Sequence, residues 1–85
     1  MVRYSRRMKL DGPGIETIRT SKRPRLSREK LARLADTSTR TIVRIEREGA
    51  DPGASIVARI AVALGVPIDS LFINEPPAAE PEQAA

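Results

Sequence analysis

Cysteine and histidine are both absent from this chain of 85 residues. Without cysteine there is no disulfide framework and no thiolate metal site, and without histidine the usual proton shuttle and zinc ligand are missing. The acidic residues Glu46, Glu48 and Asp51 lie near one another in sequence, but at the end of an expected helix in a domain too small for a catalytic cleft. We therefore expect no metal, no cofactor, no small-molecule ligand and no enzymatic activity.

Aromatic residues and long apolar runs are also scarce. Tyr4 and Phe72 are the only aromatic residues, which argues against a protein that binds single strands by stacking bases on aromatic side chains. The longest apolar tract, residues 56–66, contains Arg59 and is shorter than a membrane span of about 20 residues. The N-terminus lacks the apolar segment of a secretory signal. These absences predict a cytoplasmic protein without a membrane partner.

Charge is abundant but unevenly distributed. Residues 1–47 contain fourteen Lys and Arg against five Asp and Glu, whereas residues 48–85 contain one Arg against six Asp and Glu. The two parts therefore carry net charges of +9 and −5. A basic front half indicates a polyanionic partner. Simple solvation of surface charges is the alternative, and the helical pattern described next favours nucleic acid over it.

Hydrophobic periodicity predicts helices and no strand. Residues 14–23 form a short first helix that Pro24 ends, because the residue before a proline avoids the helical conformation. A second helix begins at Ser27, whose hydroxyl can cap a free backbone N–H. Its expected apolar face consists of Leu31, Leu34 and Ala35.

Three further helices follow the second. The third, about residues 38–47, is capped by Ser38, buries Ile42 and Ile45, and ends where Gly49 can adopt a left-handed conformation. The fourth begins after the turn at residues 51–53 and ends at Gly65. Its apolar positions are Ala54, Val57, Ile60, Ala61 and Leu64. A short fifth helix is predicted after Pro67 from Ile68, Leu71 and Phe72.

Three segments result from this pattern. Residues 1–13 are expected to be a flexible basic arm, residues 14–73 a compact all-α domain of five helices, and residues 74–85 a disordered acidic tail rich in proline and alanine. Within the domain, the second and third helices are joined by a tight turn. Arg40, Arg44 and Arg47 lie on the face of the third helix opposite Ile42 and Ile45, an arrangement suited to the DNA major groove.

Residues 14–73 resemble the Cro/CI-type helix-turn-helix domains of phage repressors and small bacterial regulators, the XRE family. The residues that carry the resemblance are Ser27, Leu31-Ala32, Ala35, Ile42, Ile45-Glu46, Pro52, Ile60-Ala61, Ala63-Leu64-Gly65-Val66 and Leu71-Phe72. The resemblance implies a lambda-repressor-like fold with the helix-turn-helix at helices 2 and 3. It also implies a bacterial or phage-encoded protein associated with the nucleoid.

The resemblance assigns roles to residues of the helix-turn-helix. The expected base contacts are Thr39, Arg40, Val43 and Arg44, since arginine can donate two bonds to guanine, and threonine and valine can meet a thymine methyl group. The expected phosphate contacts are Arg28, Lys30, Ser38 and Arg47, although Arg47 can instead pair with Glu48. Basic residues of the arm can wrap the duplex or enter a minor groove. These are Arg3, Arg6, Arg7 and Lys9.

Several positions depart from the family pattern. Asp36 stands where the turn normally has glycine, and aspartate adopts the left-handed conformation less readily. Arg28 stands where glutamine is usual. In the family, a glutamate at the position of Glu46 often pairs with a basic residue of the first helix, and here both Arg19 and Lys22 are candidates. The first helix fits the family worst.

Four apolar residues suggest a surface between two copies of the chain. Ile56 and Val62 occupy positions of the fourth helix that are usually polar in the family, and Val66 and Ile73 lie beyond it. Together they are an expected dimer interface. The alternative is that they complete the core of one copy.

The sequence therefore predicts a homodimeric transcriptional regulator that binds a pseudo-palindromic site in double-stranded DNA, with a repressor as the favoured role. An antitoxin and a restriction–modification controller of the same fold are alternatives. A protein–protein adaptor that does not read DNA is a further alternative, but it would have neutral or scattered charge on the third helix.

Overall fold

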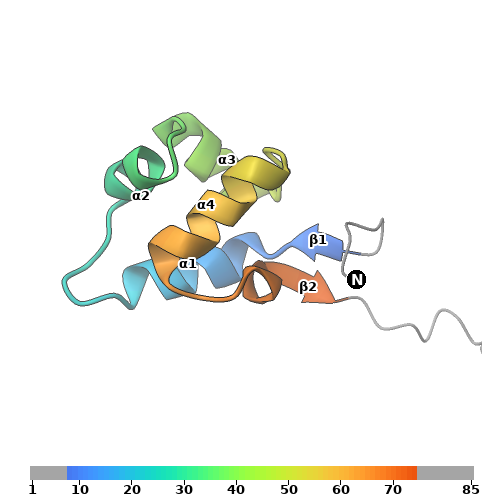
Figure 1. Ribbon diagram of the computed structural model, residues 1–85, viewed down its shortest axis with the longest axis horizontal. Coiled ribbons are helices and arrows are strands. Elements are labelled where there is room, and N and C mark those ends of the chain that lie inside the picture. Colours follow the sequence, from blue (N-terminus) through green and yellow to red (C-terminus); the bar gives the residue numbers. More distant parts are fainter. Residues whose placement is uncertain (1–7, 75–85) are drawn as a thin grey trace, which may run out of the picture.

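The computed structural model describes residues 8–74, most of which are helical. The α-helices are α1 (Gly12–Thr20), α2 (Arg28–Leu34), α3 (Thr39–Glu48) and α4 (Ala54–Leu64). A 3₁₀ turn, η1 (Ile68–Leu71), follows α4, and two strands, β1 (Met8–Leu10) and β2 (Phe72–Asn74), lie at the ends of the described chain. In the view of Figure 1, α4 lies in the middle, with α2 and α3 above it and α1 and the strands below.

Side-chain caps and left-handed glycines set several helix ends where the sequence predicts them. The Ser27 hydroxyl accepts a hydrogen bond from the Lys30 N–H at 3.0 Å, and the Ser38 hydroxyl accepts one from the Thr41 N–H at 3.1 Å. Each bond satisfies one of the free N–H groups at a helix start. Gly49 ends α3 with φ 68°, a left-handed backbone conformation that residues with a Cβ rarely adopt.

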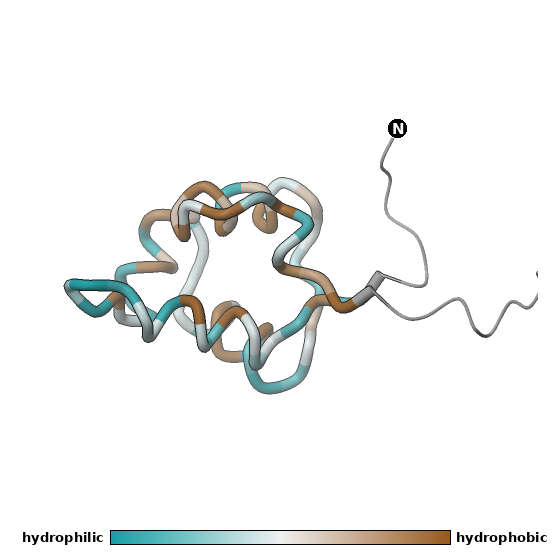
Figure 2. The backbone as a smooth tube through the Cα atoms, turned by 90° about the horizontal axis from the view of Figure 1, so that it is seen from below, coloured by the Kyte–Doolittle hydropathy of each residue, from teal (hydrophilic) through white to brown (hydrophobic). Residues whose placement is uncertain are grey.

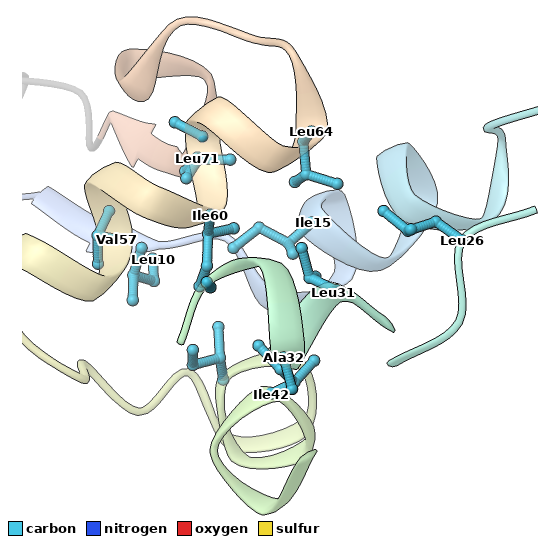
Figure 3. Close-up of a cluster of buried hydrophobic side chains, with 13 residues drawn as sticks. Leu10, Ile15, Leu26, Leu31, Ala32, Ile42, Val57, Ile60, Leu64 and Leu71 are labelled. Atoms are coloured by element: carbon cyan, nitrogen blue, oxygen red, sulfur yellow. The ribbon is translucent and has the colours of Figure 1, made fainter. Parts of the chain in front are cut away.

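A single core joins the helices and η1. Hydrophobic and hydrophilic stretches alternate along the helical segments (Figure 2), as expected for helices with one buried face. Figure 3 shows Ile15, Leu31 and Ile60 converging from α1, α2 and α4. All three are fully buried, and each contributes roughly 1.5–3 kcal/mol before the entropy of folding is counted.

The expected apolar face of α2 is wrong at one position. Leu31 and Ala35 are completely buried, but Leu34 is 52 % exposed. Ala32, which is 3 % exposed, takes the inward position instead. The buried stripe of α2 runs through Leu31, Ala32 and Ala35, and Leu34 lies at its margin in an open hollow beside α4.

The prediction of no strand is also wrong. β1 and β2 pair in an antiparallel sheet with Lys9 opposite Ile73 and Leu10 opposite Phe72. Two strands of three residues give too little alternation to be detected locally, and their pairing joins segments more than sixty residues apart. The fold is therefore mainly helical with one small sheet.

This sheet changes the expected boundary of the arm. Residues 8–13, assigned to a flexible segment, contain β1 and the start of α1. Lys9 lies on β1 with an exposed side chain, so it belongs to the folded domain. The other proposed arm residues, Arg3, Arg6 and Arg7, and residues 75–85 of the proposed tail lie outside the described residues. Asn74, expected in the tail, is the last residue of β2.

α1 begins and ends earlier than predicted. The Asp11 side chain caps the helix by accepting a hydrogen bond from the Gly14 N–H at 3.0 Å, and Pro13 fits in the first turn. The Asp-Gly-Pro-Gly segment is thus a helix start rather than a turn that precedes one. The helix ends at Thr20, before Pro24 can limit it.

The fifth predicted helix is only the 3₁₀ turn η1. Leu71 at its end is completely buried, which anchors the turn to the core. At Phe72 the backbone becomes extended, because the chain there pairs with β1. The domain thus has four α-helices and one short helical turn among its described residues. None of these helices is long and apolar enough to cross a membrane.

Candidate nucleic-acid interface

α3 has one buried face and one charged face. Ile42 and Ile45 are each 1 % exposed and hold the helix on the core. Arg40, Arg44 and Arg47 are exposed on the other side, at spacings of four and three residues that align them in one row. This row is called the arginine row below. Thr39 and Val43, also predicted to contact bases, are half-buried beside it.

The turn between α2 and α3 adopts the geometry that a helix-turn-helix requires. Asp36 has φ 58°, so it takes the left-handed conformation despite its side chain. The N–H of Thr37 donates to the carbonyl of Ala32 at 2.9 Å and closes the end of α2. Ala32 is buried on α2, the helix that packs against α3, and a larger side chain there would push the two helices apart.

A buried glutamate connects three helices. Glu46 of α3 accepts two hydrogen bonds from Arg19 of α1: Nε donates to Oε2 at 2.8 Å and Nη2 to Oε1 at 3.1 Å. Arg28 of α2 donates from Nε to Oε1 of the same carboxylate at 2.8 Å. The group of Arg19, Arg28 and Glu46, called the buried cluster below, fixes α3 against both preceding helices.

Of the two partners considered for Glu46, the structure has Arg19 and not Lys22. Arg19 is 6 % exposed, and its remaining Nη1 donates to the carbonyl of Leu26 at 3.1 Å. Each charged group in this pocket therefore has a partner, as a buried charge requires. The second partner, Arg28, is not among the candidates predicted to pair with Glu46. The one sequence feature that pointed to an unusual role for it is arginine at a position where the family usually has glutamine.

Arg28, predicted to bind phosphate, is thus engaged within the protein. Its hydrogen bond to Glu46 raises the pKa of the Arg28 guanidinium above its ordinary value, so the group stays charged. Its Nη2 also lies 3.5 Å from Oε2 of Glu16. Only Nη1 has no partner among the described residues. A phosphate contact by Arg28 would have to use that nitrogen.

The other residues predicted to contact phosphate differ in whether their side chains already have partners within the protein. Lys30 and Arg47 are exposed and form no ion pair within the described part of the chain. The Ser38 hydroxyl already caps α3 and lies 3.0 Å from the Thr41 hydroxyl. Arg44, predicted to contact bases, lies near Glu48 rather than free, with Nε 3.5 Å from Oε1. Both side chains are more than half exposed, so this pair is weak.

The four apolar residues of the expected dimer interface do not form one patch. Ile56 and Val66 pack against the core, as the alternative reading of these residues expected. Val62 is 80 % exposed and shares an apolar hollow with Leu34. Ile73 is exposed on β2 and lines a different hollow beside Lys9 and Glu48.

Comparison with known proteins agrees with this geometry. The model of a helix-turn-helix family matches residues 22–71, more than half of the chain. Among solved structures, the restriction-modification controller protein C.AhdI from Aeromonas hydrophila superposes with a TM-score of 0.64 at 26 % sequence identity. The match covers 72 % of this chain and 89 % of the controller. No protein of curated function matches the sequence.

Proposed function

This chain belongs to the XRE-type helix-turn-helix family of DNA-binding transcription regulators, and we propose that it acts as a repressor that reads one double-stranded DNA sequence. The observation that carries the proposal is the arginine row on α3, presented to solvent by a helix that the buried cluster fixes from behind. A helix of this kind inserts into the major groove, where base edges differ among all four base pairs.

The roles of the side chains follow from their positions. Arg40 and Arg44 would each donate two hydrogen bonds to a guanine, with Thr39 and Val43 beside them to meet thymine methyl groups. Arg44 leaves Glu48 for the base at little cost, because their pair is exposed. Lys30, Arg47 and Ser38, with Arg28 through Nη1, would contact phosphates and make binding depend steeply on salt.

A homodimer is part of the proposal. Two copies would insert their α3 helices into successive major grooves, about 34–36 Å apart, and so recognise a pseudo-palindrome. Of the four residues considered for the contact, Val62 and Ile73 have the exposure that a contact between copies needs.

Selection of bound duplexes from a random pool tests the proposal directly. The expected result is one preferred sequence with two inverted half-sites about ten base pairs apart. Placed between a promoter and a reporter gene, that sequence should lower transcription when the protein is present. Recovery of unrelated sequences without a common site would contradict the proposal.

One observation favours a second function. The superposition on C.AhdI, at 26 % identity, makes a restriction–modification controller the alternative regulatory role. The two roles differ in where the selected sequence occurs. A controller requires it in front of restriction and modification genes, whereas a general repressor does not.

A further inference from the structure

The loop between α1 and α2 carries cations that the α3 surface does not include. Lys22, Arg23, Arg25 and Lys30 line a hollow of about 360 Å³ at this loop. The rest of its lining is apolar or glycine, namely Pro24, Leu26 and residues 63–65, and includes no carboxylate. None of these four cations forms an ion pair within residues 8–74. The loop and the neighbouring Lys30 of α2 thus form a patch of positive charge without an acidic partner among the described residues.

Arg25 connects this patch to the recognition helix. It also lines a second hollow, of about 490 Å³, together with Arg28 of α2 and Arg47 of α3. Glu16 and Glu29 are part of that lining, but the four arginines there, Arg19 included, outnumber them, and Glu16 lies 3.5 Å from Arg28. The positive surface therefore begins at the end of the arginine row and continues onto the loop.

The helix-turn-helix geometry relates this surface to DNA. The first turns of a recognition helix contact base edges, and the helix before it crosses the sugar–phosphate backbone. Arg47, in the last turn of α3, therefore lies away from the bases, on the side where α2 and the loop before it approach the backbone. Arg25, beside Arg47, lies on the same side.

The region around the sheet has a different charge. The hollow that Lys9 and Ile73 line there also contains the carboxylates of Glu48 and Asp51. A phosphate strand would be repelled at those carboxylates and attracted at the loop. The two surfaces thus favour a duplex whose backbone runs along the α1–α2 loop.

We propose that Arg23 and Arg25 bind the sugar–phosphate backbone of the duplex beside the groove that α3 enters, independently of base sequence. The proposal rests on the proposed function and adds a contact outside the helix-turn-helix. Arg23 is held for this role by hydrogen bonds from its Nη1 to the carbonyls of Lys22 and Ser21, at 3.1 and 3.4 Å. Lys22 is not included, because its Nζ lies beside Gly65, at the C-terminal end of α4, where a cation stabilises the helix.

The test is the salt dependence of binding in an Arg23→Ala/Arg25→Ala variant. Affinities for the selected site and for a random duplex are measured between 50 and 200 mM salt. Loss of two phosphate contacts should lower the slope of log affinity against log salt by about 1.8 on both duplexes. Across this fourfold range, the wild type should lose about twelvefold more affinity than the variant.

Two further variants serve as controls. Arg33→Ala/Arg59→Ala removes the same charge from exposed positions that line neither hollow, and its slope should equal that of the wild type. Arg23→Lys/Arg25→Lys keeps the charge and should keep the slope. Equal slopes for Arg23→Ala/Arg25→Ala and the wild type, or an equal reduction in the Arg33/Arg59 variant, would overturn the inference. Failure of the proposed function would differ, since the wild type would then prefer no sequence while the loop variant still showed the reduced slope.

Discussion

The buried cluster and the arginine row use the same residue type for opposite purposes. Arg19 is 6 % exposed and has every charged nitrogen directed at an acceptor within the protein, two at Glu46 and one at the Leu26 carbonyl. Arg40, Arg44 and Arg47 are exposed, and only Arg44 has a partner among the described residues, the weakly held Glu48. A satisfied arginine fixes structure, whereas an unsatisfied one is available for a ligand.

This contrast separates stability from binding. Substitutions in the buried cluster should lower the free energy of unfolding, because they leave a buried charge without its partner. Substitutions in the arginine row should change DNA affinity and leave the fold intact. The four predictions below test this separation, from the largest expected effect to the smallest.

Arg19→Met should lower the free energy of unfolding by about 3 kcal/mol or more, because Glu46 would stay buried with only Arg28 as a partner. Urea denaturation followed by circular dichroism measures the change. Arg28→Met should cost less, since the Arg28 side chain is 26 % exposed and donates a single bond to Glu46. Arg33→Met, on the exposed side of α2, is the matched control, expected within about 0.5 kcal/mol of wild type. A cost for Arg19→Met no larger than that of Arg33→Met would remove the distinction between the two regions.

Gly12→Ala should lower the free energy of unfolding by roughly 1–3 kcal/mol, as overpacking does. A Cβ at Gly12 would meet the backbone carbonyl oxygens of Ile45 and Glu46, so α1 and α3 would have to separate. Because the same movement displaces the arginine row, we expect DNA affinity to fall even at temperatures where the variant is folded. Gly53→Ala is a useful comparison, since a Cβ there meets no atom and any cost comes from φ 106° alone. If Gly12→Ala binds the selected site as tightly as wild type, α1 does not control the position of α3.

Arg44→Ala should weaken binding to the selected site by about 1–3 kcal/mol and leave binding to a random duplex nearly unchanged. The free energy of unfolding should stay within about 0.5 kcal/mol of wild type, because only an exposed ion pair is lost. A mobility-shift series on both duplexes, with a denaturation curve for each variant, measures both quantities. An equal loss on the two duplexes would reassign Arg44 from base contact to phosphate contact.

Glu48→Gln should have the smallest effect. The exposed pair with Arg44 spans one helical turn and is worth roughly 0.3–0.5 kcal/mol, so stability should hardly change. Release of Arg44 and removal of a negative charge from α3 should tighten binding to the selected site about twofold, by the same free energy. Fluorescence anisotropy at low salt is the appropriate measurement. Weaker binding by Glu48→Gln would show that Glu48 orients Arg44 for DNA and does not compete with DNA for it.

The helix-turn-helix is the part of the fold that the sequence predicted best. Ser27 and Ser38 as caps, Gly49 as the left-handed end of α3, and Ile42 and Ile45 as buried residues are local features of spacing and residue type, and the structure confirms them. Asp36, which stands where the family has glycine, adopts the left-handed conformation with φ 58°. The exposure of Arg40, Arg44 and Arg47 follows from the same helical period.

The errors concern pairings between distant segments. β1 and β2 could not be predicted, because three residues show no clear alternation and the partner strand lies at the other end of the domain. Leu34 has the helical spacing of a core residue, yet the way α2 packs beside α4 leaves it 52 % exposed. Glu46 had two possible partners in sequence, and only the packing of α1 on α3 selects Arg19.

The sequence by itself determined α2, α3 and α4, the Ser27 and Ser38 caps and the row of arginines, since each depends on contacts within one or two helical turns. The tertiary structure decided which arginines are available. In the sequence nothing distinguishes Arg19 and Arg28 from Arg44. In the structure, Glu46 is buried between three helices, and its carboxylate engages the Arg19 guanidinium fully and the Arg28 guanidinium in part. A buried carboxylate needs charged partners far more than an exposed one does, because no water remains to solvate it. That requirement, which arises only when the helices pack, divides the basic residues into those that hold the fold and those left to bind DNA.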